Sequence, residues 1–355
     1  MDFLENTLRS WFYRNLPERM QNSCRDLNFI LSSDIGLIRK ENQDRVAAMY
    51  TGLDSKDPLF VAAVSDGMGG MRDGGICSSM ALSVFFSSLV RFTGGGIEER
   101  VRQSVCEANR VVFDNYRGGG GATLTAILVN SYGNRVLAHV GDTRIYSFDS
   151  NSVERHTADD SLIEAVGGSG RGLLQFVGMG EGIIPKIDSL PKERVNYAIT
   201  TDGIHGMEEG VFHKVLCNSV GIKQAADRLG ALSRWLGGQD NSSSAFLNLE
   251  EIEKDLSKYN CKHIQIWDAC GELTVPILGG GWMEQERSQN KSECLGFPRG
   301  GGEVGEVKKR GKLYVRKAQP KKSIRVRDKG GNYSASSPEN VQLDIKIISS
   351  DSKGE

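Results

Sequence analysis

Five aspartates stand where apolar segments begin or end, and their positions could bring several carboxylates together. They are Asp44 in "KENQDR", Asp66 in "VSDGMGG", Asp142 in "HVGDTR", Asp202 in "TTDGI" and Asp240 in "GGQDNSSSAF". Carboxylates gathered in one place raise one another's pKa unless a cation neutralises them. Hard divalent cations prefer such oxygen ligands, and no His or Cys cluster accompanies the acids, which favours Mg²⁺ or Mn²⁺ over Zn²⁺.

Any one of these aspartates could instead cap a turn, because Asp side chains accept hydrogen bonds from nearby backbone N–H groups. That alternative explains a single strand-end acid as well as a metal site does. Five such acids, each beside an apolar segment, favour a shared site.

The stretch "VSDGMGG" (64–70) places a glycine directly after Asp66. Gly67 lacks a Cβ, so its carbonyl oxygen could approach an ion closely, while Gly69 and Gly70 would let the chain turn sharply away. Two ions held by acids can activate water and hold a phosphoryl group during its transfer. The pattern therefore predicts a centre for phosphoryl chemistry.

Such a centre also needs a cation for the phosphate oxygens. Arg39 in "GLIRKENQDR" is the candidate, because a guanidinium binds phosphate in a bidentate way. Arg45 and Arg144 are weaker candidates, since an arginine beside a buried acid is more often its ion-pair partner.

Apolar segments separated by turn-forming residues predict the elements that position these groups. Strands are expected at 27–37, 59–66, 122–130, 135–148, 195–204 and 242–250, and helices at 74–92, 97–116 and 221–237. Strands come first, then helices, then strands again. This order favours an α+β fold with mostly antiparallel sheets over a doubly wound parallel sheet.

The chain divides into three parts. Residues 1–27 predict an N-terminal amphipathic helix, expected to pack on its own domain rather than on a membrane or a partner. Residues 28–254 carry the motifs. Residues 255–355 form a C-terminal extension with short predicted strands, in which 291–355 hold 15 Lys/Arg against 8 Asp/Glu. We expect a β-rich module whose basic face could bind a partner, although a solvated or partly disordered tail is the simpler alternative.

Composition limits the class of protein. A net charge of -1 and 39% hydrophobic residues give no general reason to expect nucleic acid or a membrane as partner. No apolar run approaches the ~20 residues that a spanning helix needs, and the N-terminus lacks a signal-peptide profile. Seven cysteines without a C-x-x-C pair favour a cytoplasmic location.

The ordered set "GLIRKENQDR", "SDGMGG", "GATLTAILV…AHVGDTRIY", "TDGI" and "QDNSSSAF" resembles the bacterial form of the type 2C metal-dependent serine/threonine protein phosphatases, over about residues 28–250. The resemblance implies two antiparallel β-sheets in a sandwich flanked by helices on both sides, with a metal site at one end. It also implies two bound Mg²⁺ or Mn²⁺ ions and a third, weaker site.

The resemblance assigns a role to each candidate residue. The roles are a bridging carboxylate for Asp66, a carbonyl ligand for Gly67, further metal ligands for Asp202 and Asp240, a contact to metal-bound water for Asp44, the third metal for Asp142, and phosphate binding for Arg39. The implied reaction is hydrolysis of phosphoserine or phosphothreonine in proteins by direct attack of a metal-bridging hydroxide, without a phospho-enzyme.

The implied partners are a phosphorylated protein substrate and a cognate serine/threonine kinase. Two alternatives remain. A catalytically inactive sensor with the same fold would bind a phosphoprotein without hydrolysing it, as the short flap at 150–192 and the unusual "NSSSAF" after Asp240 would allow. A metal-dependent hydrolase of a small phosphorylated metabolite would carry the same motifs.

Overall fold

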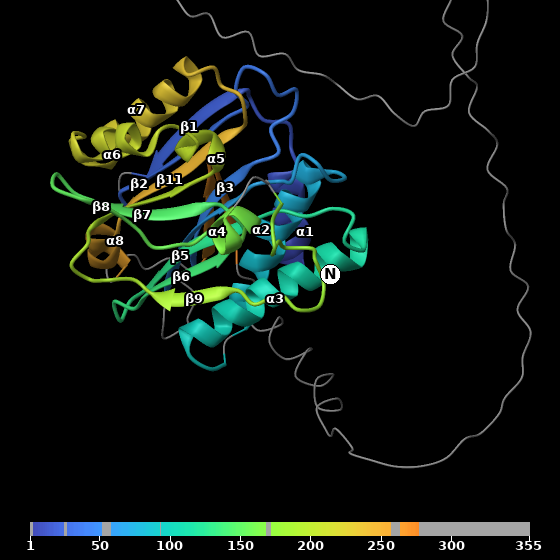
Figure 1. The fold of residues 1–355 in the computed structure, drawn as a ribbon. Coiled ribbons are helices and arrows are strands. Elements are labelled where there is room, and N and C mark those ends of the chain that lie inside the picture. The colour runs from blue at the N-terminus through green and yellow to red at the C-terminus, as the bar shows by residue number, and fades with distance from the viewer. Residues whose placement is uncertain are drawn as a thin grey trace, which may run out of the picture. The chain divides into compact units, whose positions relative to one another are not determined.

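The described part of the chain forms two stacked antiparallel sheets with helices on both outer faces (Figure 1). The computed structural model describes residues 3–24, 27–51, 58–92, 94–167, 172–256 and 263–276. All elements named below lie in the unit Met1–Gln289. The expected α+β sandwich is therefore confirmed for this unit.

The first sheet has six strands, each antiparallel to its neighbours. In spatial order they are β1 (Arg19–Cys24), β2 (Phe29–Asp34), β11 (Ser242–Asn248), β10 (Asn196–Thr200), β7 (Arg144–Phe148) and β8 (Val153–Arg155).

The second sheet has seven strands and is also antiparallel throughout. In spatial order they are β13 (Glu272–Pro276), β12 (His263–Asp268), β3 (Arg45–Thr51), β4 (Leu59–Ser65), β5 (Leu124–Asn130), β6 (Arg135–Val140) and β9 (Lys186–Ser189).

Helices cover the two outer faces. Against the second sheet pack α1 (Phe3–Phe12), α2 (Gly74–Arg91) and α3 (Ile97–Tyr116). Against the first sheet pack α5 (Asp202–His205), α6 (Glu209–Cys217) and α7 (Gly221–Trp235). Two further helices are α4 (Leu162–Val166) and α8 (Leu249–Leu256), and α8 contributes to the core between the sheets.

Strand β4 shows why a continuous apolar run forms a strand here. All seven of its residues are buried. Leu59, Val61 and Ala63 face the core under α2 and α3, whereas Phe60, Ala62 and Val64 face the other sheet. Because alternate side chains point to opposite faces, a strand with a core on each side is apolar along nearly its whole length, and in β4 the polar residue is Ser65 at its end.

Helix α2 is also apolar and buried, because other elements pack against it on several sides. Contrary to the expectation that no segment approaches the length of a spanning helix, α2 is by length and composition apolar enough to cross a membrane, yet 83% of that window is buried inside the fold. It packs against both α3 and α1 and lies over the second sheet. It is the core helix of this layer.

The N-terminal segment begins as expected. Leu4, Leu8 and Phe12 of α1 follow helical spacing and are buried in the core under the second sheet, and Phe12 contacts Phe86 edge-on. The amphipathic helix therefore packs on its own domain. It ends at Phe12, and β1 of the first sheet follows within the segment 1–27.

Two expectations from the sequence need correction. The single strand expected at 135–148 is two strands, β6 and β7, which belong to different sheets. The backbone crosses between the sheets at 141–143, where Gly141 has a φ of +108° that favours glycine.

The fold also continues beyond residue 254, the expected end of the domain. Strand β12 pairs with β3, and β13 pairs with β12, so both extend the second sheet. Trp267 of β12 is buried between the sheets against Phe29. The strands expected at "KLYVRK", "SIRVRD" and "VQLDIKII" lie outside the described residues.

Candidate metal centre

The strand register places Asp44 and Asp66 side by side. Asp44 directly precedes β3 and Asp66 directly follows β4. These strands are antiparallel, with Arg45 opposite Ser65. The residues one step beyond that pair therefore meet at the same end of the second sheet.

The first sheet brings three more acids to this end. Thr200 lies opposite Ser244 of β11 and opposite Arg144 of β7. Asp202 follows β10, Asp240 precedes β11 and Asp142 precedes β7, each by two residues. Because β6 delivers Asp142 directly from the second sheet, the acids of both sheets share one end of the sandwich.

Asp44 is the most deeply buried member of the set. Its Oδ2 accepts a hydrogen bond from the Thr201 hydroxyl at 3.0 Å, whereas its buried Oδ1 has no hydrogen-bond partner among the described residues. The pKa of Asp44 is raised to about 7, chiefly by burial and also by the carboxylates of Asp202 and Asp240. An unsatisfied buried carboxylate oxygen is costly, and a cation would satisfy it.

The pKa of Asp66 is affected by all four of the other aspartates. Burial raises the pKa of its carboxyl well above the usual value, and Asp44, Asp202, Asp142 and Asp240 add to the shift. The backbone around Asp66 is fixed, because its N–H donates to the Thr123 hydroxyl at 2.9 Å and its carbonyl accepts from the Thr123 N–H at 2.8 Å.

Asp142 responds to burial and to Asp202, and its pKa rises to about 6. Asp66 therefore lies within electrostatic reach of the four other carboxylates.

Glycines allow the backbone to close around the acids. A Cβ on Gly67 would lie 2.3 Å from the Gly74 carbonyl oxygen and 2.8 Å from that of Gln43. A Cβ on Gly203 would lie 2.0 Å from the carbonyl oxygen of Asn241. A side chain on Gly67 would push the Asp66 segment away from Gln43 and Gly74, and one on Gly203 would push the Asp202 segment away from Asn241, so both positions require glycine.

Arg39 reaches into the same group of acids. Its Nη2 lies 2.6 Å from Oδ2 of Asp240, and its Nη1 lies 2.9 Å from where a Gly69 Cβ would be. The hydrogen bond to Asp240 raises the pKa of Arg39, with smaller contributions from Asp202 and Asp66. Arg39 is the exposed cation at the edge of the acids.

The two weaker arginine candidates have structural partners. Arg45 donates to the backbone carbonyls of Phe12, Asn42 and Asp44. Arg144 forms a bidentate pair with Asp159, with distances of 2.7 to 3.2 Å. Neither guanidinium is available for a ligand without losing these contacts.

Asn241 is a structural residue of the site that the sequence patterns did not single out. Its Nδ2 donates to the carbonyls of Ile35 at 2.9 Å and Glu41 at 3.0 Å, and its Oδ1 accepts from the Gln43 N–H at 2.8 Å. It thereby ties the segment bearing Arg39 to the segment bearing Asp240. The signal available in the sequence was an amide directly after the last acid of the set.

The donor set suits a hard divalent cation. Carboxylates, a carbonyl next to Asp66 and the unpartnered Oδ1 of Asp44 are oxygen donors of the kind that Mg²⁺ and Mn²⁺ accept. Within the described ranges, no three His, Cys, Asp or Glu side chains are close enough together to hold an ion as they stand. One of the acids, Asp240, is instead engaged by Arg39.

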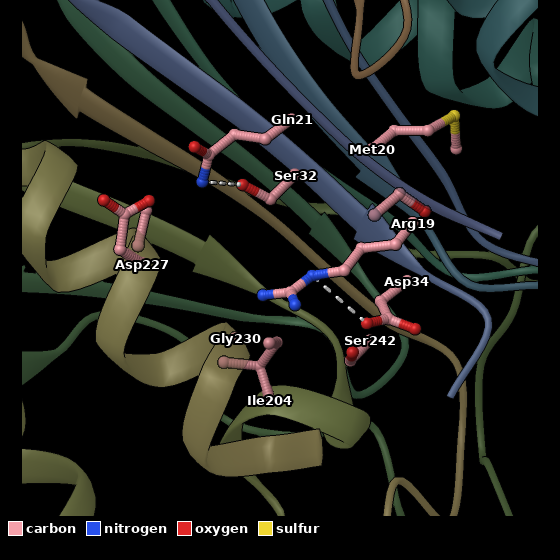
Figure 2. A pocket seen from close by; sticks show the side chains of 11 residues that line it. Arg19, Met20, Gln21, Ser32, Asp34, Ile204, Asp227, Gly230 and Ser242 are labelled. Carbon is pink, nitrogen blue, oxygen red and sulfur yellow. Dashed lines mark hydrogen bonds and ion pairs between the residues drawn. The ribbon is translucent and has the colours of Figure 1, made fainter. Parts of the chain in front are cut away.

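A separate pocket of about 320 Å³ lies on the outer face of the first sheet, between the β1 edge and α7 (Figure 2). Arg19 points into it, and Gln21 donates to Ser32 on its wall at 3.1 Å. None of the lining residues that the structure describes belongs to the proposed metal or phosphate ligands. The candidate centre therefore lies at the loop end of the sandwich rather than in this pocket.

Comparison with known proteins gives relatives of one kind. No protein-family model matches the chain. The chain is similar to the serine/threonine phosphatase Stp of Listeria welshimeri, with 27% identity over 186 residues that cover 50% of this chain and 67% of the relative. It is also similar to a putative protein phosphatase 2C-type of Streptococcus pyogenes, with 26% identity over 243 residues that cover 62% and 96%.

Solved structures with the same fold agree with these relatives. One is the catalytic domain of the serine/threonine protein phosphatase PstP in complex with 2 manganese ions, with a TM-score of 0.51 and 25% identity over 62% of this chain and 97% of that one. The serine/threonine phosphatase Stp1 from Staphylococcus aureus shares the fold, with a TM-score of 0.54 and 20% identity over 66% and 98%.

Proposed function

Because this chain belongs to the bacterial type 2C family of metal-dependent serine/threonine protein phosphatases, we propose that it hydrolyses phosphoserine and phosphothreonine in proteins. The observation that carries the proposal is the placement of Arg39 and four aspartates around Asp66 at one end of the sandwich. Phosphoryl transfer depends on positioning and on neutralising charge, which this group of residues can provide.

Mg²⁺ or Mn²⁺ is the proposed cofactor, with two ions and a third, weaker site. Asp66, the Gly67 carbonyl, Asp202 and Asp240 would hold the two ions, and Asp142 would help to hold the third. When bound, such ions activate water for attack and neutralise the phosphate oxygens. The solved structure of PstP contains two manganese ions, and the oxygen-rich donor set of this chain suits the same metal.

Arg39 would bind the phosphate oxygens of the substrate. If its guanidinium exchanges the Asp240 carboxylate for phosphate, that carboxylate becomes free for a metal. A single side chain would then couple substrate binding to the ligand set. Thr201 has a positioning role, because its hydroxyl holds the buried carboxylate of Asp44.

The two alternatives, an inactive phosphoprotein sensor and a hydrolase of a small phosphorylated metabolite, can be told apart by comparing a few substrates. The inactive sensor has no specific observation in its favour, since all five acids are present. We propose a phosphoprotein substrate rather than a small metabolite because the named relatives are protein phosphatases. A serine/threonine kinase that makes this substrate is the corresponding partner.

The test is phosphate release from phosphoserine, phosphothreonine and phosphotyrosine peptides and from glucose 6-phosphate, in Mn²⁺ and in EDTA. We expect release from the phosphoserine and phosphothreonine peptides in Mn²⁺ and none in EDTA. Release from the sugar phosphate alone would favour the metabolite hydrolase. Peptide binding without release would favour the sensor.

A further inference from the structure

Four large apolar side chains are exposed beside the candidate centre. They are Leu37 at 54% exposure, Ile38 at 61%, Trp235 at 81% and Leu236 at 50%, and we call them the rim patch. Single exposed apolar residues are ordinary, but a group of four that includes a tryptophan is typical of an interaction surface.

The two segments that carry the rim patch form one surface. The Leu37 N–H donates to the Gly238 carbonyl at 2.8 Å. A Cβ on Gly36 would lie 2.5 Å from the Asp240 carbonyl oxygen and 2.7 Å from that of Gly238. The backbones of 36–38 and 238–240 are therefore in direct contact, so the side chains of 37–38 and 235–236 belong to neighbouring positions.

The rim patch is held in place rather than loosely exposed. Arg234, the residue before Trp235, binds Asp34 of β2 through Nη1 at 2.8 and 3.0 Å and fixes the end of α7 on the first sheet. Asn241 holds the other segment through the Ile35 carbonyl. Because the backbone that carries the rim patch is fixed by these contacts, binding there costs little backbone conformational freedom.

The rim patch lies beside the proposed phosphate ligand. Ile38 is covalently bonded to Arg39, and Gly238 precedes Asp240 by two residues. Consecutive Cα atoms are about 3.8 Å apart, so the patch begins within one or two residues of the proposed phosphate ligand. The rim patch is therefore within reach of the residues that flank a phosphoresidue bound at Arg39.

We infer that the rim patch binds large apolar side chains of the phosphoprotein substrate within about two residues of its phosphoserine or phosphothreonine. This inference rests on the proposed function and names a feature of its substrate. Leu37, Ile38, Trp235 and Leu236 bury apolar surface against the peptide, and Trp235 is the specificity-determining residue with the largest contact.

The test compares two phosphothreonine peptides, one with Leu and one with Ser at the two positions on each side, and p-nitrophenyl phosphate as a substrate without flanking residues. The variant is Trp235→Ala. The matched control is Val220→Ala, because Val220 is 86% exposed at the other end of α7, roughly 22 Å away along the helix.

We expect the wild-type protein to have a kcat/KM about tenfold higher for the Leu peptide than for the Ser peptide. Trp235→Ala should remove most of this preference, chiefly through KM, and leave hydrolysis of p-nitrophenyl phosphate within about twofold of wild type. Val220→Ala should change neither. An unchanged Leu preference in Trp235→Ala, or an equal loss on all three substrates, would overturn the inference.

Binding of the same peptides, measured by fluorescence anisotropy of an attached dye, separates this inference from the proposed function. Tighter binding of the Leu peptide that Trp235→Ala abolishes supports the rim patch even without turnover. Loss of a dimer in Trp235→Ala, with peptide affinity unchanged, would instead make the patch a self-association surface and overturn the inference.

Discussion

The guanidinium of Arg39 lies 2.6 Å from the carboxylate of Asp240, so a proposed phosphate ligand and a proposed metal ligand neutralise each other in this arrangement. The charges of Asp202 and Asp66 also raise the pKa of Arg39. A metal ion bound to Asp240 and a phosphate bound to Arg39 would therefore each weaken this ion pair.

Replacing Arg39 tests its proposed role in binding the phosphate and its ion pair with Asp240. Charge-assisted hydrogen bonds contribute about 1.5–3 kcal/mol, so Arg39→Ala should lower kcat/KM for p-nitrophenyl phosphate by roughly 10- to 150-fold. Because Asp240 is then free, affinity for Mn²⁺ in calorimetric titration should stay equal or increase. Arg19→Ala, which removes an exposed arginine of β1, is the control and should change neither value. Unaltered kcat/KM in Arg39→Ala would contradict the assignment.

The backbone contact at Gly203 supports a prediction about stability. A Cβ there would lie 2.0 Å from the Asn241 carbonyl oxygen, so Gly203→Ala should lower the free energy of unfolding by ~2 kcal/mol or more and weaken Mn²⁺ binding. A Cβ on Gly230 would meet no described atom within 4 Å, so Gly230→Ala in α7 should raise the free energy of unfolding by about 0.5–1 kcal/mol. Urea denaturation measures both, and similar values for the two variants would refute the argument.

The buried carboxylate of Asp44 predicts a pH dependence. Its pKa rises from 3.8 to about 7 because of burial. Between these values the folded protein binds more protons than the unfolded chain, so the stability contributed by Asp44 is complete at low pH and falls as the pH rises towards 7. The buried His205, whose pKa is well below 6.5, acts in the opposite sense as the pH falls below that value.

The contribution of Asp44 to stability is therefore the difference in the free energy of unfolding between wild type and Asp44→Asn. It is measured in EDTA by chemical denaturation at several pH values. We expect wild-type stability to fall relative to the variant by at least ~1 kcal/mol between pH 5 and pH 8. Saturating Mn²⁺ should abolish this slope in the wild type. Parallel curves for the two proteins in EDTA would show that Asp44 does not titrate as described.

Truncation distinguishes the folded unit from the C-terminal extension. Removal of 290–355 retains every described helix and strand, so turnover of p-nitrophenyl phosphate should be unchanged. Removal of 255–355 deletes β12 and β13, exposes the core around Trp267 and breaks the ion pair between Arg14 and Asp268. That shorter chain should lose its cooperative thermal transition. Full activity after the larger deletion would show that β12 and β13 are dispensable.

Much of the fold could be predicted from the sequence where a local pattern had a single cause. The apolar run of β4 and the spacing of α2, α3 and α7 predicted those elements. The prediction of one strand over 135–148 was wrong because apolar residues stand on both sides of Gly141, while the change of sheet depends on tertiary contacts. A Cβ on Gly141 would lie 2.6 Å from Thr123, a residue of another segment.

The acids of the site could be predicted because each stands at a strand end. The residues that hold the site in place could not be predicted. Thr201 and Asn241 act through contacts with residues 157 and about 200 positions away. The domain boundary at 254 was wrong for a related reason. Strand β12 is identified by its pairing with β3, which lies more than 200 residues earlier in the chain.

The central claim is that the five acids form a metal centre that hydrolyses phosphate esters. The most direct measurement is the hydrolysis of p-nitrophenyl phosphate by wild type and Asp66→Asn, in Mn²⁺, Mg²⁺ and EDTA, with circular dichroism to confirm that both proteins are folded. We predict turnover by wild type with either metal, none in EDTA, and a loss of at least about 100-fold in Asp66→Asn. Turnover that persists in EDTA, or equally in Asp66→Asn, would contradict the claim.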